Sequence, residues 1–365
     1  MKHVFLFEYI SGGGIKNSSE FEFLIPEGFS MLSSLIKDFS LFGIHIHTLI
    51  DERIAPKFLQ THSNEIKNQI ISYVIIPKGE EIQNHLQKIV TKVDYVLCIA
   101  PEFSNILYNL IAFFETSLKS HQLLLSLPSS AILLFTDKLM TESFLHSSGF
   151  CAPHSIKLDL ETVKNIPKSK SEYIIKPFDG VGASDTYCIP SDLRKNISSV
   201  FDAIQKRAPH QHFIIQKKQS GIALSAFIGC QDGQLSFLIF NTQNIKYHEI
   251  DQLYQIHQLE YSGGSTPYTD LPPDMEKIIR DIATAISSQF DFTGFFGLDF
   301  VFDISTNTYS IVDINPRVTT PYIAISELFR ENHSNILECL FGKFSGRLIG
   351  KKEYVKTDQR EISLN

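Results

Sequence analysis

The sequence predicts a protein of mixed class, in which an α/β part is followed by an α+β part. Over residues 1–120, short apolar runs alternate with helical patterns, and this alternation favours a parallel sheet covered by helices. Later in the chain, pairs of apolar runs are separated by short turns, which favours antiparallel hairpins. A length of 365 residues is enough for two or three domains, each with a core of its own.

The N-terminal part is expected to be a Rossmann-like domain over residues 1–120. Residues 4–7, 44–49 and 95–100 are apolar and are predicted to form buried strands, and residues 27–39 have the pattern of a helix. A glycine-rich loop follows the first strand, where an open parallel sheet usually places ligands. This loop comprises Ser11, Gly12, Gly13 and Gly14.

The later two-thirds of the chain is predicted to contain two hairpins. One joins residues 224–229 to residues 235–240 through a Gln-Asp-Gly turn, and the other joins residues 295–302 to residues 309–315. The other elements expected here are helices at residues 136–149 and 272–290 and strands at residues 173–176 and 213–216. Residues 351–365 are polar and are expected to be loosely ordered.

Composition and charge argue against several classes of protein. The 33 basic and 40 acidic residues give a net charge of −7, which disfavours nucleic acid or an anionic membrane as the main partner. The five cysteines are dispersed, which indicates reduced thiols and no zinc site. No apolar stretch approaches the roughly 20 residues that span a bilayer, and the apolar run at the N-terminus ends at Glu8 without a cleavage pattern. We therefore predict a cytoplasmic protein.

The strongest functional signal lies in the last predicted hairpin. Asp313 and Asn315 are two residues apart on a strand and point to the same face, and Asp299 can share that face if the strands pair. Two carboxylates and an amide oxygen suit Mg²⁺, which also binds substrate phosphates. On a surface hairpin such acids would merely be solvated, but these interrupt apolar strands, where unpaired acids are costly. We predict that the three residues bind a metal and that Arg317, at the strand's end, binds a phosphate oxygen.

A second signal is a lysine that precedes a glycine-rich loop. Lys176 ends a predicted strand, and Gly180, Gly182, Ala183 and Ser184 follow it. The backbone N–H groups of such a loop can approach phosphate oxygens, while the lysine supplies a positive charge. The lysine precedes the glycines, so the segment is not a P-loop, and a plain turn is the alternative. Together with the predicted metal hairpin, it favours a phosphate site.

Three further features are less specific. Lys138 lies near the start of a predicted helix and would by itself be a solvated lysine, but its position upstream of Lys176 singles it out. His45 and His47 alternate on a strand and could bind a metal, yet no further ligand cluster accompanies them, so we interpret them as satisfied or exposed. Residues 261–267 are a glycine-rich loop that either covers a substrate or connects two elements.

In order and spacing, these residues resemble the ATP-grasp superfamily over roughly residues 120–345. The matching residues are Lys138, Lys176 with its glycine loop, Gln216, Asp299, and the run Asp313-Ile314-Asn315-Pro316-Arg317. The resemblance implies that both lysines contact nucleotide phosphates, that the loop closes over them, and that the acid–acid–Asn set holds Mg²⁺. It also implies that the arginine stabilises charge during phosphoryl transfer and that the glutamine lies near the adenine.

The resemblance also implies a fold. Residues 1–120 would be the Rossmann-like pre-ATP-grasp domain, residues 121–212 the first ATP-grasp subdomain with the phosphate loop, and residues 213–350 the second with the metal hairpin, followed by the polar tail. Two departures stand out. Asp313 occupies a position where glutamate is usual, which leaves its coordination open. Residues 216–222 lack the carboxylate that often holds the ribose, which leaves the ribose contact open.

Several motifs are similar to an ATP-grasp subgroup that includes tyramine–L-glutamate ligase. They lie at residues 8–14, 26–32, 50–53, 99–102 and 315–321. This similarity implies a position near the substrate or the nucleotide for Ser11, Gly12, Gly13 and Glu27. The residues themselves also allow a tight turn at the serine–glycine loop and a charge at the start of a helix for the glutamate.

The resemblance implies an ATP-dependent carboxylate–amine ligase that forms an amide bond through an acyl phosphate. Its cofactors would be ATP and Mg²⁺, with Mn²⁺ as a substitute, and Lys176 and Arg317 would be catalytic. The substrates would be a small carboxylate such as glutamate and a small amine or amino acid, and a homodimer is the default assembly. Two alternatives stay open, namely a kinase-like phosphoryl transferase and an ATP-binding regulatory or assembly protein without turnover.

Overall fold

The computed structural model contains one parallel and three antiparallel sheets among the residues that it describes. These residues are 1–15, 22–159, 161–162, 170–180, 183, 185–191, 197–209, 211–342, 344–356 and 362–364. A parallel sheet at the N-terminus followed by antiparallel sheets confirms the predicted mixture of α/β and α+β parts.

The N-terminal domain is a doubly covered parallel sheet. Its elements are β1 (His3–Glu8), η1 (Glu22–Leu24), α1 (Ile25–Leu41), β2 (His45–Asp51), α2 (Ala55–Thr61), α3 (Ser63–Lys67), β3 (Ile71–Ile76), α4 (Gln83–Val90), β4 (Tyr95–Ile99), η2 (Phe103–Asn105), α5 (Ile106–Ser117) and β5 (Leu123–Leu124). The strand order is β3-β2-β1-β4-β5, and all neighbouring pairs are parallel. Val4 and Leu6 belong to the core under α1, whereas Phe5 and Phe7 belong to the core under α4 and α5. This alternation explains why helices cover both faces.

The helix predicted at residues 136–149 is α7 (Lys138–Ser147), and a separate helix that was not predicted, α6 (Ser129–Thr136), ends just before it. Asp137 between them is extended, and its carboxylate accepts hydrogen bonds from the backbone N–H groups of Leu139 and Met140. These groups are among the donors that the start of a helix leaves unsatisfied. Asp137 therefore begins a new helix and makes Lys138 its first residue.

A six-stranded antiparallel sheet follows in the chain. Its elements are β6 (Ser155–Leu158), β7 (Tyr173–Pro177), β8 (Tyr187–Ile189), α8 (Ile197–Arg207), β9 (Phe213–Lys217), β12 (Ile245–Asp251) and β13 (Ile256–Tyr261). The strand order is β12-β13-β8-β7-β9-β6. Val200 and Ile204 of α8 share one buried cluster with Ile175 and Phe213, so this helix covers one face of the sheet.

A four-stranded antiparallel sheet contains both predicted hairpins. Its elements are β10 (Ile222–Gln231), β11 (Gln234–Thr242), α9 (Pro273–Phe290), β15 (Gly294–Asp303), β16 (Thr308–Asn315), α10 (Tyr322–Glu331) and α11 (Glu338–Phe341), and the order is β11-β10-β15-β16. Ile282 of α9 lies in the same buried cluster as Leu298 on one face. On the other face, the ring of Tyr322 in α10 lies 5.9 Å from that of Phe227. The hairpin strands are therefore buried on both sides.

The prediction of a loosely ordered tail is wrong for residues 352–356 and 362–364. The first of these segments forms β17 (Lys352–Lys356), which pairs antiparallel with β14 (Gly263–Thr266), and β18 (Ile362–Leu364) adds a third strand. The backbone hydrogen bonds of β17 do not depend on an apolar pattern, and the fully buried Tyr354 anchors the strand. The glycine-rich segment at residues 261–267 is thus a strand over residues 263–266, paired in a sheet.

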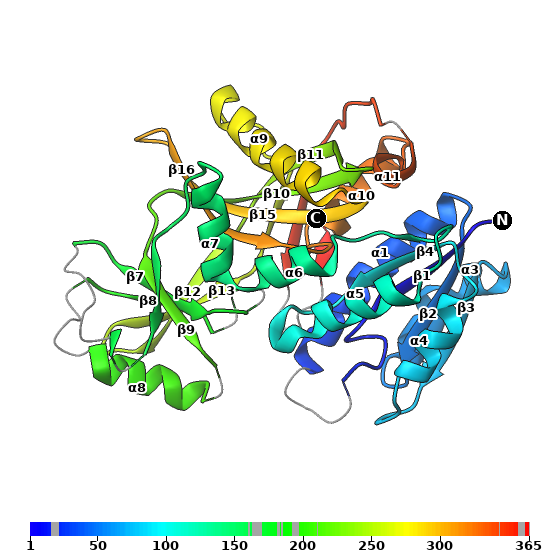
Figure 1. Cartoon of the computed structure of the whole chain (residues 1–365), viewed down its shortest axis with the longest axis horizontal. Coiled ribbons are helices and arrows are strands. Elements are labelled where there is room, and N and C mark those ends of the chain that lie inside the picture. The colour runs from blue at the N-terminus through cyan, green and yellow to red at the C-terminus, as the bar shows by residue number, and fades with distance from the viewer. Residues whose placement is uncertain are drawn as a thin grey trace.

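Figure 1 shows the N-terminal sheet with its helices on one side of the molecule and the six-stranded sheet with α8 on the other, while the four-stranded sheet and α9 lie above and between them. β9, β12 and β13 all follow residue 212 in the chain but hydrogen-bond within the six-stranded sheet. We propose that the three predicted modules are spatial units and that their boundaries do not follow the chain strictly. After β10 and β11 of the second ATP-grasp subdomain, the chain returns once to the first subdomain through β12 and β13. None of the helices among the described residues has the length and apolarity needed to cross a bilayer.

Candidate active site

A cavity of about 350 Å³ lies where the three larger sheets meet. Its wall combines Glu8 at the carboxyl end of β1, Lys176 of β7, and Asp299 of β15. Of the predicted site residues, ten line it, and these are Glu27, Lys138, Lys176, Gly180, Ala183, Gln216, Asp299, Asp313, Asn315 and Arg317. Gly182 and Ser184 lie outside the described residues. The fold therefore gathers side chains from distant parts of the sequence around one space.

The three predicted metal ligands point to one another. Asp299 and Asp313 are direct partners across β15 and β16, and a register shift follows Asp299. Asn315 Nδ2 donates to Asp299 Oδ2 at 2.9 Å, and Gln243 Nε2 donates to the other carboxylate oxygen at 2.9 Å. Burial, followed by the neighbouring Asp313 carboxylate, raises the pKa of Asp299 to about 6. Two acids this close favour a cation between them, and their oxygen donors fit Mg²⁺.

Lys138 supplies a positive charge next to this acidic pair. Its backbone N–H donates to the carbonyl of Phe178 at 3.2 Å, which ties the start of α7 to the loop after β7. Its Nζ lies 2.8 Å from Asp313 Oδ2 and donates to the carbonyl of Gly180 at 3.4 Å. The lysine therefore connects the acidic hairpin to the glycine-rich loop.

Lys176 lies beside the same hairpin. Its Nζ donates to the carbonyl of Val312 at 2.9 Å, and the residue is buried. Burial, and then the charge of Lys138, lower the pKa of Lys176 to about 8. Two lysines and two carboxylates thus share a poorly solvated space, where an anion such as a phosphate would be attracted strongly by the lysines.

Gln216 lies on β9 at another part of the wall. Its side-chain oxygen accepts a hydrogen bond from the Ser155 hydroxyl at 2.9 Å. Apolar side chains from neighbouring strands line the cavity with it, among them Ile174, Ala223 and Val301. Apolar walls with a fixed amide are suitable for a flat heterocycle.

Arg317 lies where the ATP-grasp part meets the N-terminal domain. Its Nε lies 2.9 Å from Glu102 Oε1 in a buried ion pair, and Nη1 donates to the carbonyl of Val318 at 3.1 Å. Glu102 follows β4, so the carboxyl end of the parallel sheet holds the arginine in position. The sequence motif at residues 99–102 had indicated this region without indicating the pairing.

Glu27 also lines the cavity, where it binds two partners. Its Oε1 accepts from the Thr320 hydroxyl at 2.7 Å, and its Oε2 forms an ion pair with Lys356. Burial alone would raise the pKa of Glu27, but the Lys356 ammonium and the Thr320 hydroxyl outweigh it and lower that pKa. Glu27 therefore faces the cavity as a carboxylate.

Ser11, Gly12 and Gly13, predicted to lie near a ligand, are not part of the cavity wall. They form a tight turn around Glu8, in which the Ser11 N–H donates to Glu8 Oε2 at 2.6 Å and the Gly12 N–H donates to the Glu8 carbonyl at 2.8 Å. Gly13 has a φ of 85° and lies against Ile76, so a larger residue would be strained there. The turn therefore holds Glu8 in the cavity wall, whereas Ser11, Gly12 and Gly13 do not line the cavity.

No pattern in the sequence marks Gln243 or Lys356 as a site residue. Gln243 follows β11 in a polar stretch with no motif, yet its amide fixes Asp299. Lys356 belongs to the segment that was predicted to be loosely ordered, yet its side chain reaches Glu27. Both depend on contacts between distant segments, for which a single sequence carries no signal.

Comparison with known proteins agrees with this geometry. Residues 135–321, slightly more than half of the chain, match the family described as the ATP-grasp domain, and residues 44–132 match the pre ATP-grasp 3 domain. The chain is 25% identical over 342 residues to tyramine–L-glutamate ligase of Methanocaldococcus jannaschii, which covers 91% of this chain and 89% of that protein. The ligase of the same name from Methanocaldococcus fervens is also 25% identical, over 91% of this chain and 94% of its own.

Solved structures share the fold. An ATP-grasp superfamily protein from Archaeoglobus fulgidus has a TM-score of 0.67 at 18% identity, over 100% of this chain and 98% of that one. The biotin carboxylase domain of Hydrogenobacter thermophilus 2-oxoglutarate carboxylase, a dimer solved with MgADP and bicarbonate, has a TM-score of 0.69 at 11% identity, over 98% of this chain and 74% of that one. The chain therefore belongs to the ATP-grasp family, and over most of its length it resembles the tyramine–L-glutamate ligases of that family.

Proposed function

We propose that this ATP-grasp ligase uses Mg²⁺-ATP to join a small carboxylate to a small amine through an acyl phosphate. The observation that carries the proposal is the cluster of Asp299, Asp313 and Asn315, which faces Lys138 and Lys176 within one cavity. This combination offers oxygen donors to a cation and cations to phosphates in the same space.

Asp299, Asp313 and Asn315 fit a magnesium ion. Burial, and then repulsion by Asp313, raise the pKa of Asp299, and a divalent cation would offset both effects by stabilising the carboxylate. The Asn315 amide can keep its N–H bond to Asp299 while its oxygen faces the ion. When bound, Mg²⁺ would supply charge neutralisation to the phosphates that are transferred.

The remaining residues would bind and orient the nucleotide. Lys138 would exchange its contact with Asp313 for a phosphate oxygen, and Lys176 would hold a second one. Gly180 and Ala183 would bring the loop close to the phosphates, and Gly182 and Ser184 stay predictions in the same role. Gln216 and the apolar residues around it would hold the adenine.

The chemistry needs two displacements. An oxygen of the substrate carboxylate attacks the γ-phosphorus of ATP, so that the acyl phosphate forms and ADP leaves. The amine nitrogen then attacks the acyl carbon, phosphate leaves, and the nitrogen loses a proton to give the amide. Arg317, held by Glu102, would stabilise the negative charge that develops during the first step.

We propose glutamate, or an amino acid like it, as the carboxylate and a small amine or amino acid as its partner. The names of the two curated relatives point to tyramine and L-glutamate. The same cavity also has charged groups for such substrates. Lys356 and Arg317 can attract carboxylates, whereas Glu8 and Glu27 can accept hydrogen bonds from an ammonium group.

An ADP-release screen of carboxylates crossed with amines, beginning with L-glutamate and tyramine, tests the function. ADP formation that requires both substrates, together with an amide product seen by mass spectrometry, supports the ligase. A stable phosphorylated product without an amide would instead favour a kinase-like transferase. ATP binding without ADP formation across the whole panel would favour a regulatory or assembly protein.

Further properties stay proposals. Mn²⁺ can substitute for Mg²⁺ at oxygen ligands, and we propose that it supports turnover here. A homodimer agrees with the dimeric biotin carboxylase domain among the similar structures. A cytoplasmic location is proposed from the dispersed cysteines, all five of which are free in the structure.

A further inference from the structure

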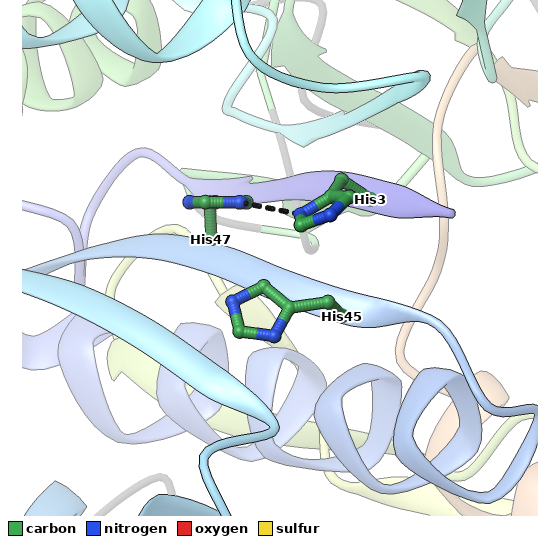
Figure 2. A group of neighbouring side chains, drawn as sticks. All are labelled: His3, His45 and His47. Atoms are coloured by element: carbon green, nitrogen blue, oxygen red, sulfur yellow. Dashed lines mark hydrogen bonds between the residues drawn. The ribbon is translucent and has the colours of Figure 1, made fainter. Parts of the chain in front are cut away.

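A cluster of three histidines lies on the N-terminal sheet, at the end of the strands opposite the cavity. His3 belongs to β1, and His45 and His47 belong to β2. Figure 2 shows their rings gathered around one space beside these two strands. The register pairs His3 with His45, and His47 is two residues further along, so all three share one face of the sheet. The sequence had left His45 and His47 without a third ligand, because it did not reveal this register.

The rings are close enough to share one ion. Their centroids are 4.9 Å apart for His3 and His45, 5.3 Å for His3 and His47, and 5.0 Å for His45 and His47. One ring nitrogen of each lies within 4.8 Å of the others, and His3 Nδ1 is 3.0 Å from His47 Nε2. Nitrogens that bind one tetrahedral ion at about 2.0–2.1 Å lie roughly 3.3 Å apart. Small side-chain rotations would therefore create a common centre.

The surroundings keep the rings in place. All three histidines are partly buried, and they stand on neighbouring strands of a parallel sheet. The Ser72 hydroxyl on β3 lies 2.9 Å from His45 Nε2. Near the cluster, Lys92 adds a positive charge to the field of His47, while Asp94 accepts a hydrogen bond from the His3 backbone N–H at 2.8 Å.

We propose that His3, His45 and His47 bind one divalent transition-metal ion, with Zn²⁺ as the principal candidate and water in the remaining position. Imidazole nitrogens suit Zn²⁺, Ni²⁺ and Co²⁺, whereas Mg²⁺ prefers oxygen. β1 runs from His3 to Glu8, which places the cluster about 16 Å from the cavity wall. The ion therefore occupies a second site, which joins β1 to β2 and is separate from the magnesium site proposed above.

The test is a titration of untagged, chelator-treated protein with Zn²⁺ alone, followed by calorimetry, and with Co²⁺, followed by visible absorption. All proteins carry Cys151→Ser, because Cys151 is the exposed cysteine and could bind zinc by itself. His47→Gln and His45→Gln each remove one ligand. His121→Gln removes an exposed histidine of the same domain and serves as the matched control. Asp313→Asn separates this site from the one in the cavity.

We expect one equivalent of Zn²⁺ to bind and to raise the Tm of the parent protein, of His121→Gln and of Asp313→Asn. Removal of a direct ligand should weaken binding by more than the roughly 10–100-fold that is typical of outer ligands, and should abolish the Tm increase. The metal-free variants should keep the parent's circular dichroism, and His45→Gln replaces His47→Gln if the latter fails to fold. The proposal would be overturned if the parent does not bind Zn²⁺, or if both histidine variants bind Zn²⁺ as tightly as the parent does.

Discussion

Asp299 and Asp313 face each other across a hairpin that is buried on both sides, and their repulsion is the electrostatic reason to place a cation there. Lys138 neutralises part of this charge from the start of α7. In the proposed mechanism, phosphates and a metal ion would share the space, so that the lysines would bind the anions and the acids would bind the ion. Catalysis would therefore depend on individual charges more than on any single covalent step.

Asp313→Asn should lower kcat by about 10²–10³, because one electrostatic element of the phosphoryl-transfer site is lost. The change keeps the size of the side chain and removes a repulsive charge, so the free energy of unfolding should not decrease by much. Coupled assay of ADP release measures kcat. Asp303→Asn, at the far end of the same hairpin and outside the cavity wall, is the control and should keep parental turnover. Full activity of Asp313→Asn would remove this residue from the mechanism.

The stability of the metal-free protein should depend on pH through Asp299. Its pKa is about 6 in the folded protein and 3.8 in the reference state, so the folded protein holds the proton more tightly. The stabilisation from this group is then complete below pH 3.8 and is lost as the pH rises to about 6, with a magnitude on the order of 3 kcal/mol.

Asp299→Asn removes this dependence. Denaturant unfolding without Mg²⁺ should show the variant gaining stability relative to the parent between pH 4.5 and pH 7. If the difference in unfolding free energy between the variant and the parent is the same at pH 4.5 and pH 7, the pKa of Asp299 is not raised in the folded protein.

At the scale of elements, the break between α6 and α7 positions Lys138. Asp137→Ala should cost about 1 kcal/mol of stability, because two N–H groups lose their acceptor. It should also raise the KM for ATP. Without the cap the first turn of α7 would fray, and Lys138 is the first residue of that turn. Asp137→Ser keeps a capping oxygen and should restore both values. Thermal unfolding and ATP titrations provide the measurements, and an unchanged KM in Asp137→Ala would show that the cap does not position the lysine.

The sequence was informative about elements that have an apolar pattern and about residues that belong to motifs. The strands at residues 295–302 and 309–315 are apolar with acids at defined positions, so both the hairpin and its shared acidic face could be predicted. β17 has a polar sequence and depends on pairing with β14, so no pattern revealed it. His3 joins His45 only through the register of two strands, and Lys356 reaches Glu27 across 329 positions. Such partners are set by tertiary structure.

At the scale of the whole molecule, the ion pair between Lys356 and Glu27 joins the C-terminal strands to the N-terminal domain beside the cavity. The two side chains are only 7% and 14% exposed. Lys356→Met should therefore destabilise the protein by about 3 kcal/mol, because it leaves Glu27 as an uncompensated buried charge.

A double-mutant cycle by denaturant unfolding isolates this pair. Glu27→Gln combined with Lys356→Met should be more stable than Lys356→Met alone, because the orphaned charge is gone. If the changes in unfolding free energy caused by the two single substitutions simply add, the contact between Glu27 and Lys356 does not stabilise the protein.

The proposed activity requires one metal ion that would be held between the hairpin acids and the phosphates of the nucleotide. Electron paramagnetic resonance of Mn²⁺, titrated in the presence of a non-hydrolysable ATP analogue, measures this directly. We expect the parent protein to bind Mn²⁺ with phosphorus couplings from the nucleotide, and Asp299→Asn and Asp313→Asn to weaken that binding by at least about 10–100-fold. Unchanged Mn²⁺ affinity and couplings in both variants would contradict it.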